Sequence, residues 1–164
     1  MITFCNFQLS ADKFRQEVDK IRGDKHVTVG IHEDAGLHPD SGMTNASLGA
    51  TLHFGAEITK NGHTITIPPR PWLDVGVESG TQEYLREISD CLAKGVPLDV
   101  ILERIGLEAA AAVQEYMTNL SEPPNAPSTI AKKGSDNPLI DTGELRQSVT
   151  SVVSDDALPP EGIE

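Results

Sequence analysis

The stretch from Ser121 to Val149 reads S-E-P-P-N-A-P-S-T-I-A-K-K-G-S-D-N-P-L-I-D-T-G-E-L-R-Q-S-V and holds most of the turn-forming residues of the chain. Its prolines fix φ and remove backbone donors, while Gly134 and Gly143 permit positive φ. We therefore expect neither a helix nor a central strand before Pro138. A long arm in a small protein is usually functional. We predict that this arm, residues 121–143, reaches a neighbouring subunit.

The remaining composition is that of an ordinary globular protein. With 164 residues, 38% of them hydrophobic, the chain is long enough to form one domain around its own core. No apolar run approaches the ~20 residues of a membrane span, and we expect no signal peptide, because no basic region precedes an apolar one. Cys5 and Cys91 lack metal-ligand spacing, so we expect two reduced, buried thiols.

The net charge of −12 and the sequence pI near 4.7 restrict the partners of the chain. Proteins that grip nucleic acid need a basic surface to neutralise phosphates. The acidic balance argues against such binding. It is compatible with a channel whose repelling surface lets DNA slide through.

Apolar periodicity predicts an α+β fold. We expect a small, mostly antiparallel sheet of four to five strands, with an Asn61-Gly62 hairpin, two longer helices packed on one face, and the extended proline-rich arm. A single domain, residues 1–153 including the arm, precedes an acidic flexible tail, residues 154–164. We expect strands at residues 2–9, 26–32, 57–60, 63–67 and 148–153, and helices at residues 11–22, 46–54, 81–94, 97–117 and 142–146.

The segment I-P-P-R-P-W-L, residues 67–73, combines three prolines with the one tryptophan of the chain. One interpretation is a rigid turn that inserts a core aromatic. A second, compatible with the first, places Arg70 and Trp72 at a subunit contact, because both residue types are enriched in interface hot spots.

Leu139-Ile140-Asp141-Thr142-Gly143 matches the apolar-apolar-Asp-Thr-Gly pattern of aspartic proteases. Those enzymes need two such aspartates that share a proton, and they need a further supporting sheet. The chain beyond Gly143 is too short to supply that sheet. We therefore interpret Asp141 and Thr142 as turn and helix-capping residues. An aspartic-type peptidase that uses Asp141 remains the alternative.

Other candidate sites are weaker, and we predict no enzyme, no cofactor and no metal site. His26 and His32 share a strand, but six residues place them ~20 Å apart. No H-x-x-x-H or C-x-x-C pattern accompanies the histidines. Lys132-Lys133-Gly134 resembles the end of a phosphate loop, but the upstream glycine is absent, so we expect an exposed basic loop. No Ser-His-Asp or Cys-His arrangement is recognisable.

Several stretches resemble one protein family. They are V-T-V-G-I at residues 27–31, residues 46–56 with their ending H-F-G-A, I-P-P-R-P-W-L at residues 67–73, and the arm with its ending P-L-I-D-T-G-E-L at residues 138–145. Together they resemble the virion morphogenesis proteins of long-tailed bacteriophages, which are neck or tail-completion proteins at the head–tail junction. The family usually has Glu where this chain has His53.

The resemblance implies a structural virion protein that assembles as a ring, commonly six-fold, and joins the tail to the head connector while DNA passes through without specific binding. Implied partners are other copies of the chain, head-completion or connector proteins, and the tail tube or tail terminator. The implied location is the neck or tail of the virion, after assembly in the host cytoplasm. A monomeric adaptor that binds through its proline-rich arm is a second alternative. We predict the subunit interface at Arg70, Trp72, Pro123, Pro124, Pro127, Lys132, Lys133, Leu139, Ile140, Asp141, Thr142 and Gly143.

Overall fold

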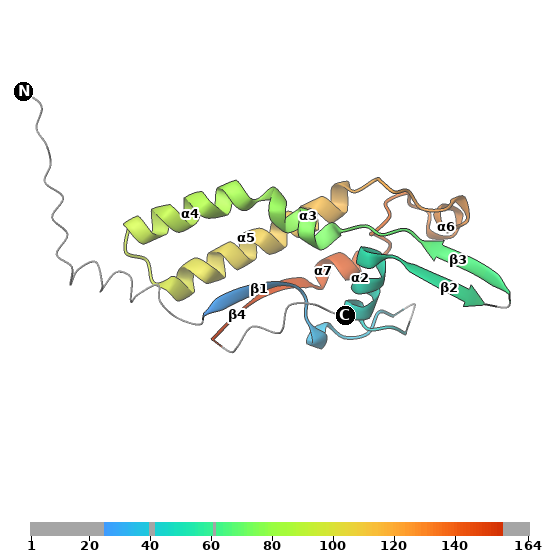
Figure 1. Ribbon diagram of the computed structural model, residues 1–164, viewed down its shortest axis with the longest axis horizontal. Coiled ribbons are helices and arrows are strands. Elements are labelled where there is room, and N and C mark those ends of the chain that lie inside the picture. Colours follow the sequence, from blue (N-terminus) through green and yellow to red (C-terminus); the bar gives the residue numbers. More distant parts are fainter. Residues whose placement is uncertain (1–24, 40–41, 61, 156–164) are drawn as a thin grey trace, which may run out of the picture.

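The computed structural model describes residues 25–39, 42–60 and 62–155. The strand predicted at residues 2–9, the helix predicted at residues 11–22 and most of the predicted tail therefore lie outside the described residues. Figure 1 shows the arrangement of the elements. In chain order they are β1 (His26–Ile31), the 3-10 turn η1 (Glu33–Ala35), α2 (Asn45–Phe54), β2 (Ala56–Lys60), β3 (His63–Ile67), α3 (Trp72–Ser79), α4 (Thr81–Ala93), α5 (Leu98–Asn119), α6 (Pro127–Lys133), α7 (Glu144–Gln147) and β4 (Val149–Ser154).

The fold is α+β, as predicted, but the single sheet of four to five strands is wrong. The four described strands form two separate antiparallel pairs, β1 with β4 and β2 with β3. The first pair runs from His26 opposite Ser154 to Ile31 opposite Val149. The second is the predicted hairpin, which projects from the body of the molecule (Figure 1). Pro68 and Pro69 follow β3 directly and offer no N–H donor, so the hairpin cannot continue into the other pair.

Helix α5 lies over the β1–β4 pair and carries most of the core. Glycine is required at position 106, because a Cβ there would lie 2.7 Å from Val27 Cγ2 and 2.8 Å from Ser151 Cβ. Ala109 and Ala110 on the same helix are both buried. The two long helices do not share one face of the sheet, however, because α4 packs on α5 and not on the strands (Figure 1).

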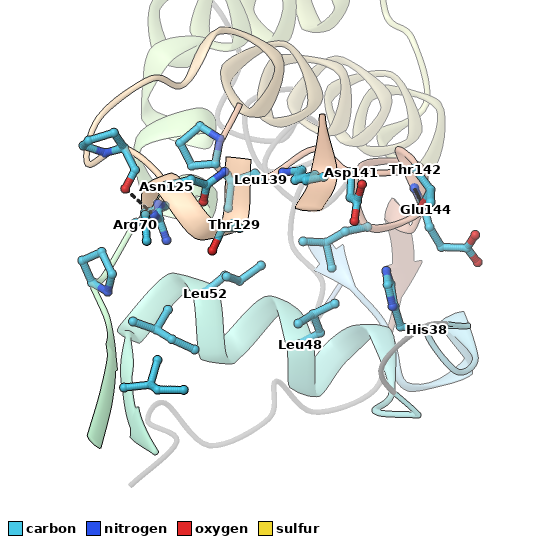
Figure 2. Close-up of a pocket in the computed structure, with 18 of the residues that line it drawn as sticks. His38, Leu48, Leu52, Arg70, Asn125, Thr129, Leu139, Asp141, Thr142 and Glu144 are labelled. Carbon is cyan, nitrogen blue, oxygen red and sulfur yellow. Dashed lines mark hydrogen bonds between the residues drawn. The ribbon is translucent and has the colours of Figure 1, made fainter. Parts of the chain in front are cut away.

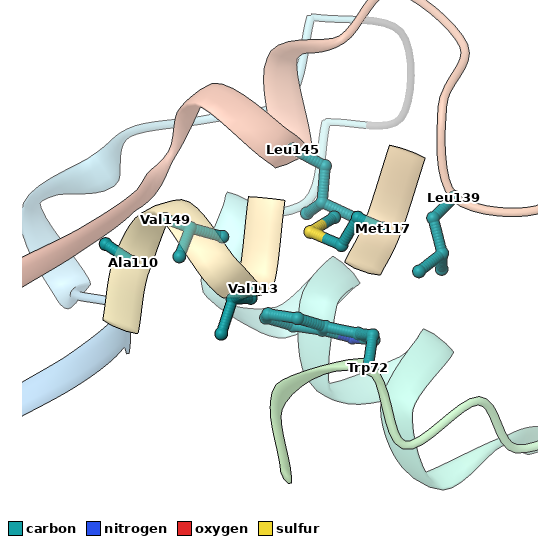
Figure 3. Close-up of a cluster of buried hydrophobic side chains, with 7 residues drawn as sticks. All are labelled: Trp72, Ala110, Val113, Met117, Leu139, Leu145 and Val149. Carbon is teal, nitrogen blue, oxygen red and sulfur yellow. The ribbon is translucent and has the colours of Figure 1, made fainter. Parts of the chain in front are cut away.

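The main core joins segments that are far apart in the sequence (Figure 3). Trp72 is 3% exposed, and its indole Nε1 donates to the Gly49 carbonyl over 3.2 Å. The prediction of a core aromatic at residue 72 is therefore confirmed. The buried cluster consists of Trp72, Ala110, Val113, Met117, Leu139, Leu145 and Val149.

A smaller cluster joins α4 to α5 through Cys91, Ile101 and Ile105. Cys91 is a buried free thiol, as predicted for it, whereas Cys5 lies outside the described residues. In the part of the chain that the structure describes, no helix has both the length and the apolar character needed to span a membrane.

The expectation of no helix before Pro138 is wrong, because α6 occupies the middle of the arm. Pro127 begins this helix at its first turn, where the missing N–H would have no intrahelical acceptor. Gly134 ends it in the left-handed conformation, with φ of 74°, and its N–H donates to the Ile130 carbonyl. Lys132 and Lys133 thus form the last turn of a helix and not a loop.

Candidate functional site

Arg70 fastens the arm to the body of the protein. Its side chain is 3% exposed, and its guanidinium Nε donates to the Pro123 carbonyl over 3.0 Å and Nη2 to the Pro124 carbonyl over 3.2 Å. Its own backbone N–H donates to the carbonyls of Leu52 and His53 at the end of α2. One residue therefore connects α2, the segment after β3, and the arm (Figure 2).

Burial lowers the pKa of the Arg70 guanidinium, because the charged form loses solvation. In the part of the chain that the structure describes, the guanidinium donates only to main-chain carbonyls and forms no ion pair. The dipoles of two carbonyls stabilise the charge without neutralising it. The positive charge of Arg70 therefore remains uncompensated at this position.

Asn137 closes the other end of the arm and was not predicted from the sequence. Its Nδ2 donates to the carbonyls of Met117 and Thr118 at the end of α5, over 3.1 and 2.9 Å. Its Oδ1 accepts from the N–H groups of Leu139 and Ile140, over 2.9 and 2.8 Å. The signal was the Asn-Pro dipeptide, since Asn before Pro favours a turn closed by its own side chain.

We expect Asn137→Ala to lower the free energy of unfolding by about 3 kcal/mol, because four hydrogen bonds to backbone groups are lost together. The measurement is urea unfolding followed by circular dichroism. The matched control is Asn119→Ala at the exposed end of α5, with an expected change within ~0.5 kcal/mol. Equal losses in the two variants would contradict this role for Asn137.

A groove of about 740 Å³ lies between the arm on one side and α2 with the hairpin on the other (Figure 2). Leu48, Leu52 and Ile65 contribute apolar surface opposite the arm. The arm side contributes Pro124, Lys133, Leu139 and the turn at residues 141–144. The groove is thus an apolar channel with charged groups on one wall.

Lys133 is the cation of the groove that solvent can reach. Its side chain is half-buried, and Nζ donates to the Asn137 carbonyl over 2.6 Å. Burial lowers the pKa of Lys133, and the nearby Arg70 charge lowers it further, against the opposing effect of Asp141. Two cations with lowered pKa values therefore lie close enough to repel each other.

The residues predicted at the subunit interface divide by exposure. Arg70, Trp72, Leu139 and Gly143 are buried within the protomer, so a direct contact of these four with a neighbouring subunit is corrected to an internal role. The arm is also not extended away from the body, because Arg70 and Asn137 hold it against its own protomer. Surface remains available, in whole or in part, at Pro123, Pro124, Pro127, Lys132, Lys133, Ile140, Asp141 and Thr142.

The Asp-Thr-Gly motif forms a turn at the rim of the groove. Thr142 Oγ1 accepts from the Glu144 N–H over 3.3 Å, which confirms its turn role. Gly143 has φ of 87°, a conformation that favours glycine. Asp141 is exposed, and no hydrogen bond joins it to this turn among the described residues. The capping role predicted for Asp141 is therefore corrected, and its carboxylate faces the groove.

Two of the described histidines, His32 and His53, have structural partners. His32 contacts Thr28 Oγ1 over 3.0 Å and Thr150 Oγ1 over 2.9 Å. His53 is 7% exposed, with Nε2 at 3.3 Å from Asp74 Oδ2 and its ring edge-on to Trp72. Within residues 25–39, 42–60 and 62–155, no group of three or more His, Cys, Asp or Glu side chains is placed to hold a metal ion.

The hairpin carries exposed apolar surface that the sequence analysis did not single out. Ile58 and Ile65 are direct cross-strand partners and are 47% and 59% exposed. The signal was available in the Asn-Gly turn, which sets the register and places both isoleucines on one face. A two-stranded hairpin alone is marginally stable in water, so this face is suited to contact another surface.

The fold and the site define a small α+β protein whose proline-rich arm folds back on its own body and lines a groove. No family model, curated protein or solved structure matches the chain.

Proposed function

We propose that the chain is a structural subunit of the neck or tail of a long-tailed bacteriophage. It forms a ring that joins the tail to the head connector around the DNA channel. Its partners are further copies of itself, a head-completion or connector protein, and the tail tube or tail terminator. The chain performs no catalysis in this role.

The observation that carries this proposal is that the stretches that resemble phage neck proteins contact one another in the folded chain. H-F-G-A ends α2, I-P-P-R-P-W-L follows β3, and the arm comes some fifty residues later. Arg70 of the second stretch donates to carbonyls of the arm, and its backbone N–H donates to the His53 carbonyl of the first. The structure thus brings the three stretches into direct contact with one another.

The projecting hairpin supports self-association. Exposed apolar pairs that belong to a projecting element are typical of interaction sites. The net charge of −12 opposes contact between copies. A contact through Ile58 and Ile65 gains free energy from apolar burial, which this repulsion does not reduce. The same acidity suits a channel that DNA must leave freely.

Electron microscopy tests the proposal directly. We expect negative-stain images of the purified full chain at high concentration, or of the chain added to purified tails, to show rings of uniform diameter. Immunogold labelling of virions should place the protein at the head–tail junction. A strict monomer that binds neither tails nor heads would overturn the proposal and favour the adaptor. A pepstatin-sensitive activity lost in Asp141→Asn would favour the peptidase.

Deleting part of the arm would not test whether the arm contacts a neighbouring subunit. Removing residues 123–133 takes away both carbonyl acceptors of Arg70 and leaves a buried cation without partners. Such a variant loses stability whether or not the arm contacts a neighbour. Substitutions on exposed surface avoid this difficulty.

We expect the double substitution Ile58→Thr with Ile65→Thr to shift the purified protein from rings toward monomers, by at least about tenfold in the association constant. Threonine keeps the β-branched shape, so the hairpin still forms. Val152→Thr on β4, where the side chain is 45% exposed, is the matched control and should leave assembly unchanged. Sedimentation velocity measures both. Unchanged assembly in the double variant would exclude the hairpin as the ring contact.

A further inference from the structure

The groove holds positive charge that nothing in the described part of the chain neutralises by an ion pair. Lys133 and Arg70 each donate to main-chain carbonyls, and burial lowers the pKa of each. Asp141 and Glu144 line the same groove, and Asp141 has a larger effect on the pKa of Lys133 than Arg70 has. Positive charge is therefore confined to the end of the groove at Lys133 and Arg70, in a protein whose net charge is −12. That end suits the carboxylate of a segment whose apolar side chains lie along the rest of the groove.

The chain contains one segment of that chemistry beyond β4. Residues 155–164 read D-D-A-L-P-P-E-G-I-E, with four acidic residues and no basic one. Leu158 and Ile163 supply apolar side chains. Pro159 and Pro160 favour the extended polyproline conformation, which loses little entropy when it enters a groove. Carboxylates, apolar side chains and an extended backbone all match the groove.

We propose that residues 155–164 of a second copy bind in the groove. Their carboxylates contact Lys133, with the charge of Arg70 beneath it, and their apolar side chains lie against Leu48 and Leu52. The inference rests on the proposed function, because it takes the second copy from the ring. It gives each subunit a tail that reaches the next one and a groove that receives the tail of another.

The reach of the chain favours a second copy over the same one. Helix α7 lines the groove with Glu144 and Leu145. Strand β4 then runs from α7 away from α6 and the β2–β3 hairpin (Figure 1). Five residues of β4 carry the chain about 17 Å from Val149. Residues 156–164 span at most about 30 Å, so the return would use more than half of that length. The returning tail would also meet Asp141 and Glu144 before Lys133. The tail of a neighbouring copy does not need to span this return distance, and it can approach Lys133 without first passing Asp141 and Glu144.

Carbodiimide cross-linking of the full chain tests the contact, because this reagent joins an amine to a carboxylate without a spacer. Unlabelled protein is mixed with protein uniformly labelled with heavy nitrogen, cross-linked, digested and analysed by mass spectrometry. We expect Lys133 joined to tail carboxylates in peptide pairs that contain one labelled and one unlabelled partner. Pairs that are uniformly labelled or uniformly unlabelled, with no mixed pair, would show contact within one chain and overturn the proposal.

Two lysine substitutions locate the contact without changing charge. Lys133→Arg removes the reactive amine and should abolish the cross-link. Lys132→Arg is the matched control: Lys132 is exposed on α6 and does not line the groove, so the cross-link should persist. Loss of the cross-link in both variants, or in neither, would place the tail elsewhere and overturn the proposal. Both variants keep the positive charge, so folding is not at issue.

Charge reversal tests whether the contact between Lys133 and the tail carboxylates strengthens self-association. We expect Lys133→Glu to weaken self-association at least about tenfold, whereas Lys132→Glu should change it less than about twofold. Replacing Asp156 and Glu161 by Lys in the Lys133→Glu chain should restore assembly. Failure of rescue would overturn the inference. Rings that lack the tail cross-link would overturn it and leave the proposed function standing. Tail cross-links in a protein that never joins particles would overturn the proposed function alone.

Discussion

Arg70→Ala is expected to lower the free energy of unfolding by about 3 kcal/mol and to release the arm from the body of the protein. The guanidinium is 3% exposed and is the donor to the carbonyls of Pro123 and Pro124. Hydrogen bonds to a charged donor contribute ~1.5–3 kcal/mol each, and truncation also leaves a cavity. Pro124 is an exposed residue, so we expect water to hydrate its carbonyl in the variant and to recover part of the loss.

Two measurements separate stability from release of the arm. Urea unfolding gives the free energy, and limited trypsin digestion at Lys132 and Lys133 reports exposure of α6. The control is Arg86→Ala, because the Arg86 side chain is 76% exposed and, among the described residues, pairs only with Glu83 at 3.9 Å; its expected effect is within ~0.5 kcal/mol. Arg70→Lys should recover only part of the loss, since an ammonium cannot reproduce the planar two-donor geometry. Full stability in Arg70→Lys would show that charge alone is required.

Gly55→Ala is expected to cost about 4 kcal/mol and to displace the hairpin. Gly55 connects α2 to β2 with φ of 79° and ψ of 171°, a region that is essentially restricted to glycine. A Cβ at this position would lie 2.7 Å from the Ile67 carbonyl oxygen and 2.9 Å from the Pro69 backbone nitrogen. Both contacts are with backbone, so neither neighbour can rotate away.

The matched control for this substitution is Gly95→Ala. Gly95 also has positive φ, at 69°, but a Cβ there meets nothing within 4 Å. Its expected cost is therefore the conformational term alone, about 1 kcal/mol. Thermal unfolding measures both variants, and assembly assays report the position of the hairpin. If the two variants lose the same stability, close backbone contact at Gly55 is not the cause.

Sequence periodicity predicted the long and regular elements. Helices α4 and α5, the strand β1 and the hairpin β2–β3 were all located to within about two residues of their observed ends. Apolar spacing determines which face of such an element is buried, and this information lies within the element itself. The turn role of Thr142 was predictable for the same reason, because its partner is two residues away.

Elements that depend on distant contacts were not predicted. Helix α6 was missed, because the prolines of the arm predict breaks in helical structure, whereas Pro127 is tolerated in the first turn of a helix. Helix α3 was missed because Trp72 was assigned to a rigid turn and no element was predicted for residues 74–79. Gly76 lies so close to α5 that a Cβ would be 2.8 Å from Val113 Cα. Only packing against α5 favours a helix at that point.

The residues of the candidate site could be selected from the sequence, but their contacts could not. The sequence alone selected the arm, Arg70 and Lys133 as important, through their proline context and through the resemblance to phage proteins. It did not reveal that Arg70 is buried against the arm of its own protomer, or that Asn137 closes that arm, because both depend on carbonyls that lie twenty to fifty residues away. Hydrogen-bond partners at that separation are set by the packing of α2, α5 and the arm.

What the sequence by itself determined is the set of local structures: the amphipathic helices, the Asn-Gly hairpin, the turn at residues 141–144, and the acidic character of the chain. Tertiary structure alone decided that the four described strands form two pairs, that the arm folds back, and that Arg70 and Lys133 meet in a groove. The physical reason is the distance along the chain over which each interaction acts. Local backbone preferences act over a few residues, whereas burial and hydrogen-bond satisfaction depend on whichever distant segments the fold brings together.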